Sequence, residues 1–166
     1  MDPVTVSVVV ARPREEVFAY LVDIANHAEF CDHFLTEWHL TRMNTAGLGA
    51  GARFRVKAPL ARFGWCGVSL VEVDAPRRIV EAGTAGKYNR VKTLTIYTLE
   101  SDSDGGTRVE LSVATEPTIL SDRIIEALGA RRWFKRQNVK ALRRLRRILE
   151  DGEGRGSRAT IAGVAG

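Results

Sequence analysis

Hydrophobic and polar residues alternate along most of the chain, and the period becomes helical near the C-terminus. In residues 4–10 valine occupies every even position, which is typical of a strand with one buried face. Six later stretches have strand character and are separated by turns rich in Gly, Pro, Asp and Ser: residues 36–42, 52–57, 65–74, 78–85, 91–100 and 107–116. The pattern predicts seven strands.

Two short helices are expected between the first two strands. Pro13 suits the first turn of a helix, and the residues after it give that helix one apolar face: Val17, Tyr20, Leu21 and Ile24. Asn26 and Glu29 have the spacing of a capping box, which predicts a second short helix containing Phe30, Cys31 and Phe34. Helices this short cannot serve as normal parallel crossovers, so we expect an antiparallel sheet and an α+β fold.

The longest predicted element is one helix over residues 121–150. Ser121 is a good N-cap and no proline interrupts the segment. Apolar residues form one stripe: Ile124, Leu128, Phe134, Leu142, Leu145 and Leu149. In the middle, Arg131, Lys135 and Asn138 take the positions that would continue it. We expect the C-terminal half to pack on the core and the middle to face a cavity; alternatively, Arg131 and Lys135 extend along the apolar edge.

Strand parity indicates which side chains form the inner face of the sheet. It directs inward Trp38, Leu40, Phe54, Val56, Thr93, Thr95, Tyr97, Leu99, Val109, Leu111, Val113 and Thr115. In residues 65–74, Glu72 and Asp74 are expected to face outward, which would turn Trp65, Ser69, Val71 and Val73 inward. No His, Asp or Glu points inward by this test, so an acid/base pair is missing.

A face that mixes aromatic rings with hydroxyls is typical of a pocket for an apolar or aromatic molecule with a few oxygens. The predicted ligand-binding residues are Phe30, Phe34, Trp38, Phe54, Trp65, Ser69, Thr95, Tyr97, Leu111, Leu128 and Arg131. The alternative is a filled core with satisfied hydroxyls. Catalytic residues are not identified by the sequence.

Basic residues are concentrated in the long helix. Nine lie between positions 131 and 147 with no acidic residue among them, which leaves 16 basic against 20 acidic residues elsewhere, a net charge of −4. Nucleic-acid binding would need aromatic residues beside the charges, and only Trp133 is available. Anionic headgroups or an acidic protein are better partners, and a solvated face is a third interpretation. The residues for such a contact are Arg136, Lys140, Arg143 and Arg147.

The length of 166 residues fits a single domain over residues 1–150. Residues 151–166 contain five glycines and are expected to form a flexible tail outside the fold. Cys31 and Cys66 give no disulfide framework or C-x-x-C pair, which favours free thiols in a reducing compartment. We see no export signal and no apolar run long enough to span a membrane, so a cytoplasmic location is expected.

Three local motifs resemble functional sites without meeting their requirements. His27, Cys31 and His33 lie in one short segment, but no second pair has metal-ligand spacing, so we expect polar residues at a pocket rim and no metal. The glycines of residues 47–51 precede a strand, whereas a dinucleotide fingerprint opens a helix. Residues 102–106 lack the later glutamate of a calcium loop. No cofactor is therefore indicated.

Several segments together resemble a known superfamily. They are residues 8–21, 49–54, 71–79, 106–109 and 142–150, which in this order and spacing are similar to the START and birch-pollen-allergen superfamily, including polyketide cyclase/dehydrase-like and coenzyme-Q-binding proteins. The resemblance implies a helix-grip fold, in which a curved antiparallel sheet grips the C-terminal helix around a cavity for lipids, quinones or polyketides. Residues 26–33 lack the Trp-Pro segment usual in the family.

Three functions follow as hypotheses. The first is the binding or transport of a small hydrophobic molecule. The second is a cyclase/dehydratase-type enzyme in which Tyr97, Ser69 or Arg131 polarises a substrate oxygen, although an acid/base pair is missing. The third is an interaction module that uses the basic helix face.

Overall fold

The structure is a computed structural model that describes residues 3–58, 64–117 and 131–164. In chain order its elements are β1 (Val4–Val10), α1 (Arg14–Leu21), the 3-10 helix η1 (Ile24–Asn26), α2 (His27–Cys31), β2 (Leu35–Leu40), β3 (Gly51–Val56), β4 (Trp65–Asp74), β5 (Arg78–Ala85), η2 (Lys87–Asn89), β6 (Val91–Ser101), β7 (Thr107–Pro117), α4 (Arg131–Asp151), β8 (Ala159–Thr160) and β9 (Gly163–Val164).

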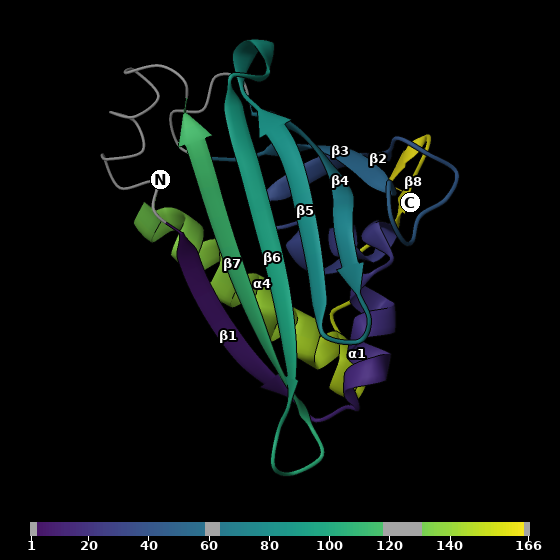
Figure 1. The fold of residues 1–166 in the computed structure, drawn as a ribbon. Coiled ribbons are helices and arrows are strands. Elements are labelled where there is room, and N and C mark those ends of the chain that lie inside the picture. Colours follow the sequence, from purple (N-terminus) through teal and green to yellow (C-terminus); the bar gives the residue numbers. More distant parts are fainter. Residues whose placement is uncertain (1–2, 59–63, 118–130, 165–166) are drawn as a thin grey trace.

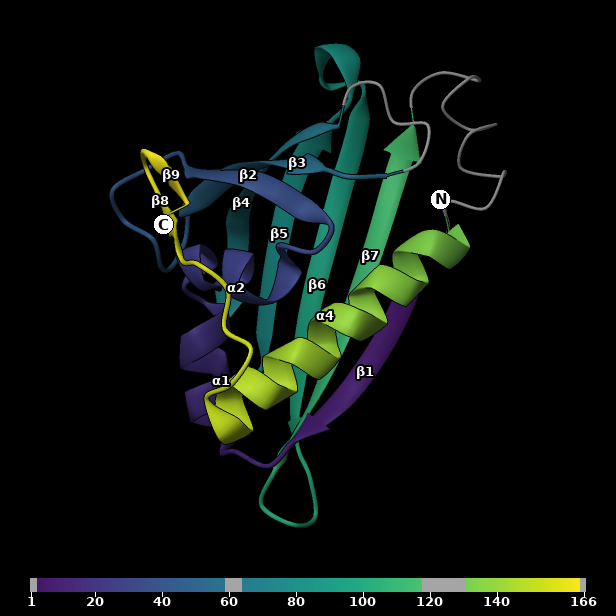
Figure 2. The ribbon, with the colours of Figure 1, turned by 180° about the vertical axis from the view of Figure 1, so that it is seen from behind.

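One curved sheet and one long helix form the body of the molecule. The seven strands are antiparallel in the order β1-β7-β6-β5-β4-β3-β2, and α4 lies across one face of the sheet beside β1 (Figures 1 and 2). The short helices α1 and α2 cover the same face near the C-terminal end of α4 (Figure 2). This arrangement confirms the predicted α+β helix-grip fold.

The core lies where the C-terminal half of α4 meets the sheet and the short helices. Leu142, Leu145 and Ile148 of α4 are at most 2% exposed and belong to the same cluster as Val17 of α1 and Val109 of β7. Burial of this apolar surface is the main force that holds α4 in place.

Arg12 fixes the end of α4. Its Nε donates to the carbonyl oxygen of Leu149 at 2.8 Å, and its Nη2 donates to that of Glu150 at 3.0 Å. The last carbonyls of a helix have no partner inside the helix and carry partial negative charge, so a guanidinium is well suited to them. The turn after β1 therefore ties the first strand to the last long helix.

The prediction for β4 is wrong in its N-terminal half. Cys66, Val68 and Leu70 are buried, whereas Val71 is 52% exposed, and Trp65 pairs with the exposed Arg55 on the outer face of the sheet. The register shifts between Leu70 and Glu72, where β4 pairs with β5. One extra residue at such a bulge reverses the parity of everything before it.

Trp65 and Ser69 therefore do not face the interior. The guanidinium of Arg53 lies 4.8 Å from the centre of the Trp65 ring, and Ser69 pairs with Gly51 on the outward register. These two residues leave the predicted ligand-binding set.

The C-terminal tail packs on the domain, contrary to the prediction that it lies outside the fold. The backbone N–H of Gly156 donates to the carbonyl of Glu29 at 3.0 Å, Ala159 is 3% exposed, and β8 and β9 lie against β2. A Cβ at position 156 would lie 2.8 Å from that carbonyl oxygen. Glycine at this position allows the close approach of the two backbones.

One helix prediction changes, and another is tested only in part. Asn26 does not cap α2 with its side chain; its Nδ2 instead donates to the carbonyl of Tyr20 at 2.9 Å. The helix predicted over residues 121–150 is described from Arg131, so its first ten residues, with Leu128, lie outside the described residues.

Candidate functional site

Most predicted site residues lie on the inner side of the sheet. Phe30, Phe34, Trp38, Phe54, Tyr97 and Leu111 are buried. Thr95 lies half-buried opposite Glu81 in the β5–β6 pairing. The rings of Trp38 and Phe54 lie 4.3 Å apart, and Phe34 meets Trp133 of α4 edge-on at 6.0 Å. The predicted aromatic lining is thus brought together, while Arg131 is exposed at the start of α4.

An acid/base pair that sequence reasoning missed lies in this interior. His27 of α2 and Glu81 of β5 are 2% and 6% exposed, and His27 Nδ1 lies 3.1 Å from Glu81 Oε1. The other ring nitrogen, Nε2, lies 2.7 Å from the carbonyl oxygen of Leu21. Among the described residues, Glu81 Oε1 has no well-aligned hydrogen-bond donor, so the contact with His27 is an ion pair by distance.

The two neighbours of His27 determine where its protons lie. A carbonyl oxygen only accepts hydrogen bonds, so Nε2 donates to Leu21. If Nδ1 had no proton, its lone pair would face an ionised carboxylate. The pair therefore holds one proton between His27 Nδ1 and Glu81, as an imidazolium–carboxylate pair or as two neutral groups.

The ion-pair form is favoured by the pKa of His27. Burial alone lowers this pKa, but the Glu81 carboxylate and the Leu21 carbonyl together raise it above the ordinary value of 6.5.

The groups beside this pair are neutral at physiological pH. Tyr97 lies 5.5 Å from His27 between ring centres, and burial, followed by the charge of Glu81, raises the pKa of its phenol well above 10.0. Burial likewise raises the pKa of Cys31 and brings that of Cys66 to about 12. Both cysteines are free and buried, and as thiols they are poor nucleophiles.

A second buried carboxylate holds the tail in place. Glu29 is 3% exposed; its Oε2 accepts a hydrogen bond from the Tyr20 hydroxyl at 2.6 Å and lies 3.4 Å from Nη1 of Arg155. Burial and Glu29 both raise the pKa of Tyr20. Because every part of this cluster is paired, we regard it as structural.

The middle of α4 presents a polar group to the interior. Asn138 is 4% exposed, and its Nδ2 has no hydrogen-bond partner among the described residues. The preceding turn contributes Trp133 and Phe134, which are half-buried. Four inner-face residues of β6 and β7 are half-buried as well: Thr93, Thr95, Val113 and Thr115. The predicted break in the apolar stripe is therefore an inward-facing amide at Asn138, whereas Lys135 is exposed.

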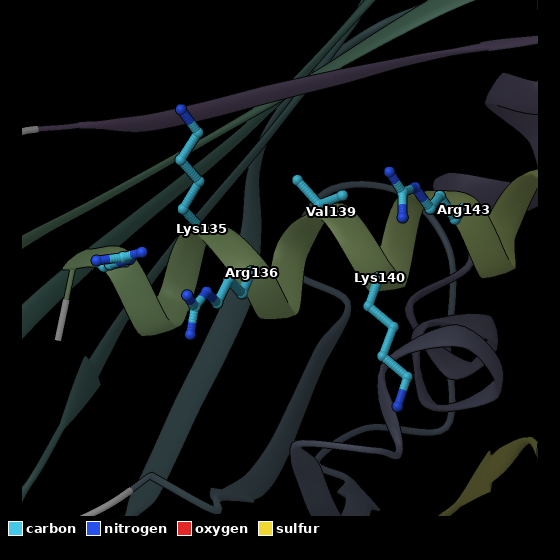
Figure 3. Close-up of a pocket in the computed structure, with 6 residues that line it drawn as sticks. Lys135, Arg136, Val139, Lys140 and Arg143 are labelled. Carbon is cyan, nitrogen blue, oxygen red and sulfur yellow. The ribbon is translucent and has the colours of Figure 1, made fainter. Parts of the chain in front are cut away.

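The outer face of α4 forms a basic groove of ≈ 440 Å³. It is lined by Arg132, Lys135, Arg136, Val139, Lys140 and Arg143, and Figure 3 shows Lys135, Val139 and Arg143 along one edge of the helix, with Arg136 and Lys140 along the other. Arg144 is not part of this surface. Its guanidinium binds both carboxylate oxygens of Asp32, one of them at 3.1 Å, and donates to the carbonyl of Gly154 at 2.7 Å.

Within residues 3–58, 64–117 and 131–164, no group of three His, Cys, Asp or Glu residues is placed to hold a metal ion. Of the helices in the described ranges, none combines the length and apolar character needed to cross a bilayer.

One sequence signal points to Glu81, whereas the burial of His27 is visible only in the structure. Glu81 has the same parity as Ile79, which is fully buried on the inner face of β5. His27 opens a helix whose every residue is buried, so the prediction that this helix exposes polar residues at a pocket rim is wrong.

Solved structures share this fold at low sequence identity. A Nitrosospira multiformis protein is 15% identical, with 90% of this chain and 97% of that chain covered and a TM-score of 0.65. A Helicobacter pylori protein is 12% identical, with 90% and 88% covered and a TM-score of 0.70. DynU16, from the dynemicin biosynthetic locus, is 18% identical, with 94% and 50% covered and a TM-score of 0.61. Among curated proteins, no sequence matches the chain.

A family profile identifies the chain more directly than these structures do. It matches residues 1–150, from β1 to the last turn of α4, and so contains every segment that carries the resemblance to the superfamily. The matched region includes the curved sheet, both short helices and the inner face described above. The chain belongs to the family described as polyketide cyclase / dehydrase and lipid transport.

Proposed function

We propose that the protein binds a small hydrophobic molecule with a few oxygen atoms, such as a lipid, quinone or polyketide, between the inner face of the sheet and α4. The observation that carries this proposal is Asn138, whose buried amide has no partner for Nδ2 among the described residues. A buried donor without a partner costs ~1–3 kcal/mol. A ligand oxygen at this position would remove that cost.

The surroundings of Asn138 suit such a ligand. Trp133 and Phe134 of the preceding turn are half-buried, and the hydroxyls of Thr93 and Thr95 lie on inner positions of the sheet. Ligand sites of this kind are mostly apolar, with a few polar groups that fix orientation. Shielding the half-buried aromatic and aliphatic surface would supply most of the affinity, at ~25 cal/mol per Å².

The first test is native mass spectrometry of the protein purified from its own host, followed by extraction of any bound molecule. A stoichiometric lipid, quinone or polyketide would support the proposal. A second measurement titrates a soluble quinone and follows quenching of tryptophan fluorescence. We expect quenching to fall strongly in Trp133→Phe and to persist in Trp65→Phe, the matched control on the outer face. Equal quenching in both variants would contradict binding near α4.

The second candidate function is a cyclase or dehydratase, and the His27–Glu81 pair favours it. A β-hydroxy carbonyl compound loses water when a base takes its α proton and an acid protonates the departing hydroxyl. Glu81 could accept that α proton while His27 returns one to the hydroxyl, so the pair holds one proton before and after the step. Glu81 would have to be reached from the interior, because both residues are buried.

Glu81→Gln tests this second function. We expect the variant to lose turnover of a β-hydroxy polyketide-like substrate while it still binds the ligand, since Gln keeps the shape of the side chain and removes its basicity. Full turnover in Glu81→Gln would exclude the pair as the acid/base group. Glu72→Gln, on an exposed part of the neighbouring strand, is the control.

A further inference from the structure

We propose that the basic groove on the outer face of α4 docks the protein on a membrane surface that carries anionic phospholipid headgroups. The groove lies on the opposite side of α4 from Asn138, so this proposal goes beyond the internal ligand site and does not depend on it.

The geometry of α4 creates this surface. Arg132, Arg136 and Lys140 are four residues apart, as are Lys135, Val139 and Arg143, so the groove lies between two neighbouring rows of side chains along ~16 Å of helix. Its lining contains five cations and no acidic residue. Like charges this close repel one another, and an anion between the rows would relieve the repulsion.

The groove cations differ from other cations of α4 in their ion pairs. Arg144 is bound to Asp32, and Arg146 lies 3.5 Å from Glu150, so these residues have structural partners. None of the five groove cations forms an ion pair with another residue in the described part of the chain. The remainder of the protein, outside positions 131–147, carries a net charge of −4. The resulting charge asymmetry turns α4 toward an anionic surface.

The side chains of the groove favour a lipid surface over a nucleic acid or an acidic protein. Nucleic-acid binding without base readout relies on free aromatic faces, but Trp133 packs against Phe34 and Phe134 at 6.0 and 5.0 Å. A protein interface needs buried apolar or aromatic anchors, and the groove offers only Val139. Cations without such anchors suit phospholipid headgroups, where each Lys or Arg contributes ~1 kcal/mol near the surface.

Vesicle flotation with the full chain tests the proposal. The vesicles contain phosphatidylcholine alone or phosphatidylcholine with phosphatidylglycerol. We expect the protein to bind the phosphatidylglycerol vesicles at least ~10-fold more tightly, and to release them at ~1 M salt, where the Debye length is ~3 Å. Equal binding to both vesicles, or binding that persists in high salt, would overturn the proposal.

Two triple variants with the same change of charge separate the groove from overall charge. The groove variant is Arg136→Gln, Lys140→Gln and Arg143→Gln; the control is Arg42→Gln, Lys92→Gln and Arg108→Gln, all at exposed positions away from α4. We expect the groove variant to lose at least ~10-fold in vesicle binding and the control to lose little. Equal losses would show that overall charge, and not the groove, is responsible. Unchanged thermal melting of both variants confirms that the fold is intact.

The wild type and the two triple variants also test whether the groove binds other anions. Saturable binding of inorganic phosphate or of a DNA duplex, without binding to phosphatidylglycerol vesicles, would contradict membrane docking. Quinone quenching measured without vesicles should be the same in the groove variant and the wild type. A variant that loses vesicle binding but keeps quinone quenching is therefore defective in docking alone. A variant that keeps vesicle binding but loses quenching is defective in the internal site alone.

Discussion

At the residue scale, the buried His27–Glu81 pair is expected to have a large effect on stability. Removing one partner of a buried pair leaves the other without compensation, which typically costs ~3–5 kcal/mol. We expect Glu81→Ala to lower the free energy of unfolding by ~3 kcal/mol or more. The double variant His27→Leu with Glu81→Leu should recover much of that loss, because it removes both polar groups. Urea denaturation measures both values.

The control for this experiment is Glu72→Ala. Glu72 lies 3.0 Å from Arg78 at an exposed site, where both side chains are about half accessible, and exposed pairs contribute ~1 kcal/mol or less. If Glu81→Ala lost no more than this control, the interior pair would not contribute to stability as an ion pair.

The same pair predicts a pH dependence of stability. Burial lowers the pKa of His27, but Glu81 and the Leu21 carbonyl together raise it above 6.5 in the folded protein. Its contribution is complete below pH ~6.5 and is lost as the pH rises through the folded-state pKa. We expect the difference in unfolding free energy between wild type and Glu81→Gln to be largest near pH ~6 and to shrink toward pH ~9. A difference that grows over this range would contradict the assignment.

At the element scale, the regular alternation of the strands made the fold predictable, whereas a local irregularity in one strand led to errors in the predicted site. Alternation located all seven strands, and parity assigned the inner faces of β6 and β7 correctly, because those strands pair without interruption. It failed in β4, where the bulge near Val71 reverses the parity of Trp65 and Ser69. A bulge is set by pairing with the neighbouring strand, which a single strand's sequence does not contain.

The acid/base pair was missed for a related reason. In β5, Ile79, Val80 and Glu81 are all buried, so the parity that Glu81 shares with Ile79 does not by itself separate an inner from an outer face. Placing His27 against Glu81 also requires the packing of α2 on the sheet, which depends on tertiary contacts rather than on local pattern. The break in the stripe of α4, by contrast, was visible in the sequence, since Asn138 occupies an apolar position of a regular helix.

The tail is the second element whose role depends on tertiary contacts. A chain that ends at Asp151 would leave the buried Glu29 without Arg155 and would remove the buried Ala159. We expect this truncation to lower the unfolding free energy by ~2 kcal/mol, measured by urea denaturation. Arg158→Ala, which removes a more exposed pair with Asp23, should cost ~1 kcal/mol or less. A truncated chain as stable as the full one would contradict the structural role of the tail.

At the scale of the whole molecule, the packing that holds α4 and the two proposed binding surfaces lie at opposite ends of this helix. The last turns of this helix carry Leu142, Leu145 and Ile148 into the core, and Arg12 binds its final carbonyls. The first described turns carry half-buried aromatic residues, and outward cations that form no ion pair with another described residue. This division suits the two proposals, because a helix end that contacts a ligand or a membrane has to be free of the packing that fixes the other end.

Asn138 lies at the boundary between these two ends and separates them experimentally. Asn138→Leu removes a buried donor without a described partner and extends the apolar stripe, so we expect the unfolding free energy to rise by ~1 kcal/mol. The same change should weaken binding of the quinone probe, because leucine cannot donate a hydrogen bond to a quinone oxygen. Stability that rises as binding falls is the pattern expected of a functional polar group. Urea denaturation and fluorescence quenching give the two values. A variant that is destabilised by more than ~1 kcal/mol would show instead that the amide has a structural partner in the fold.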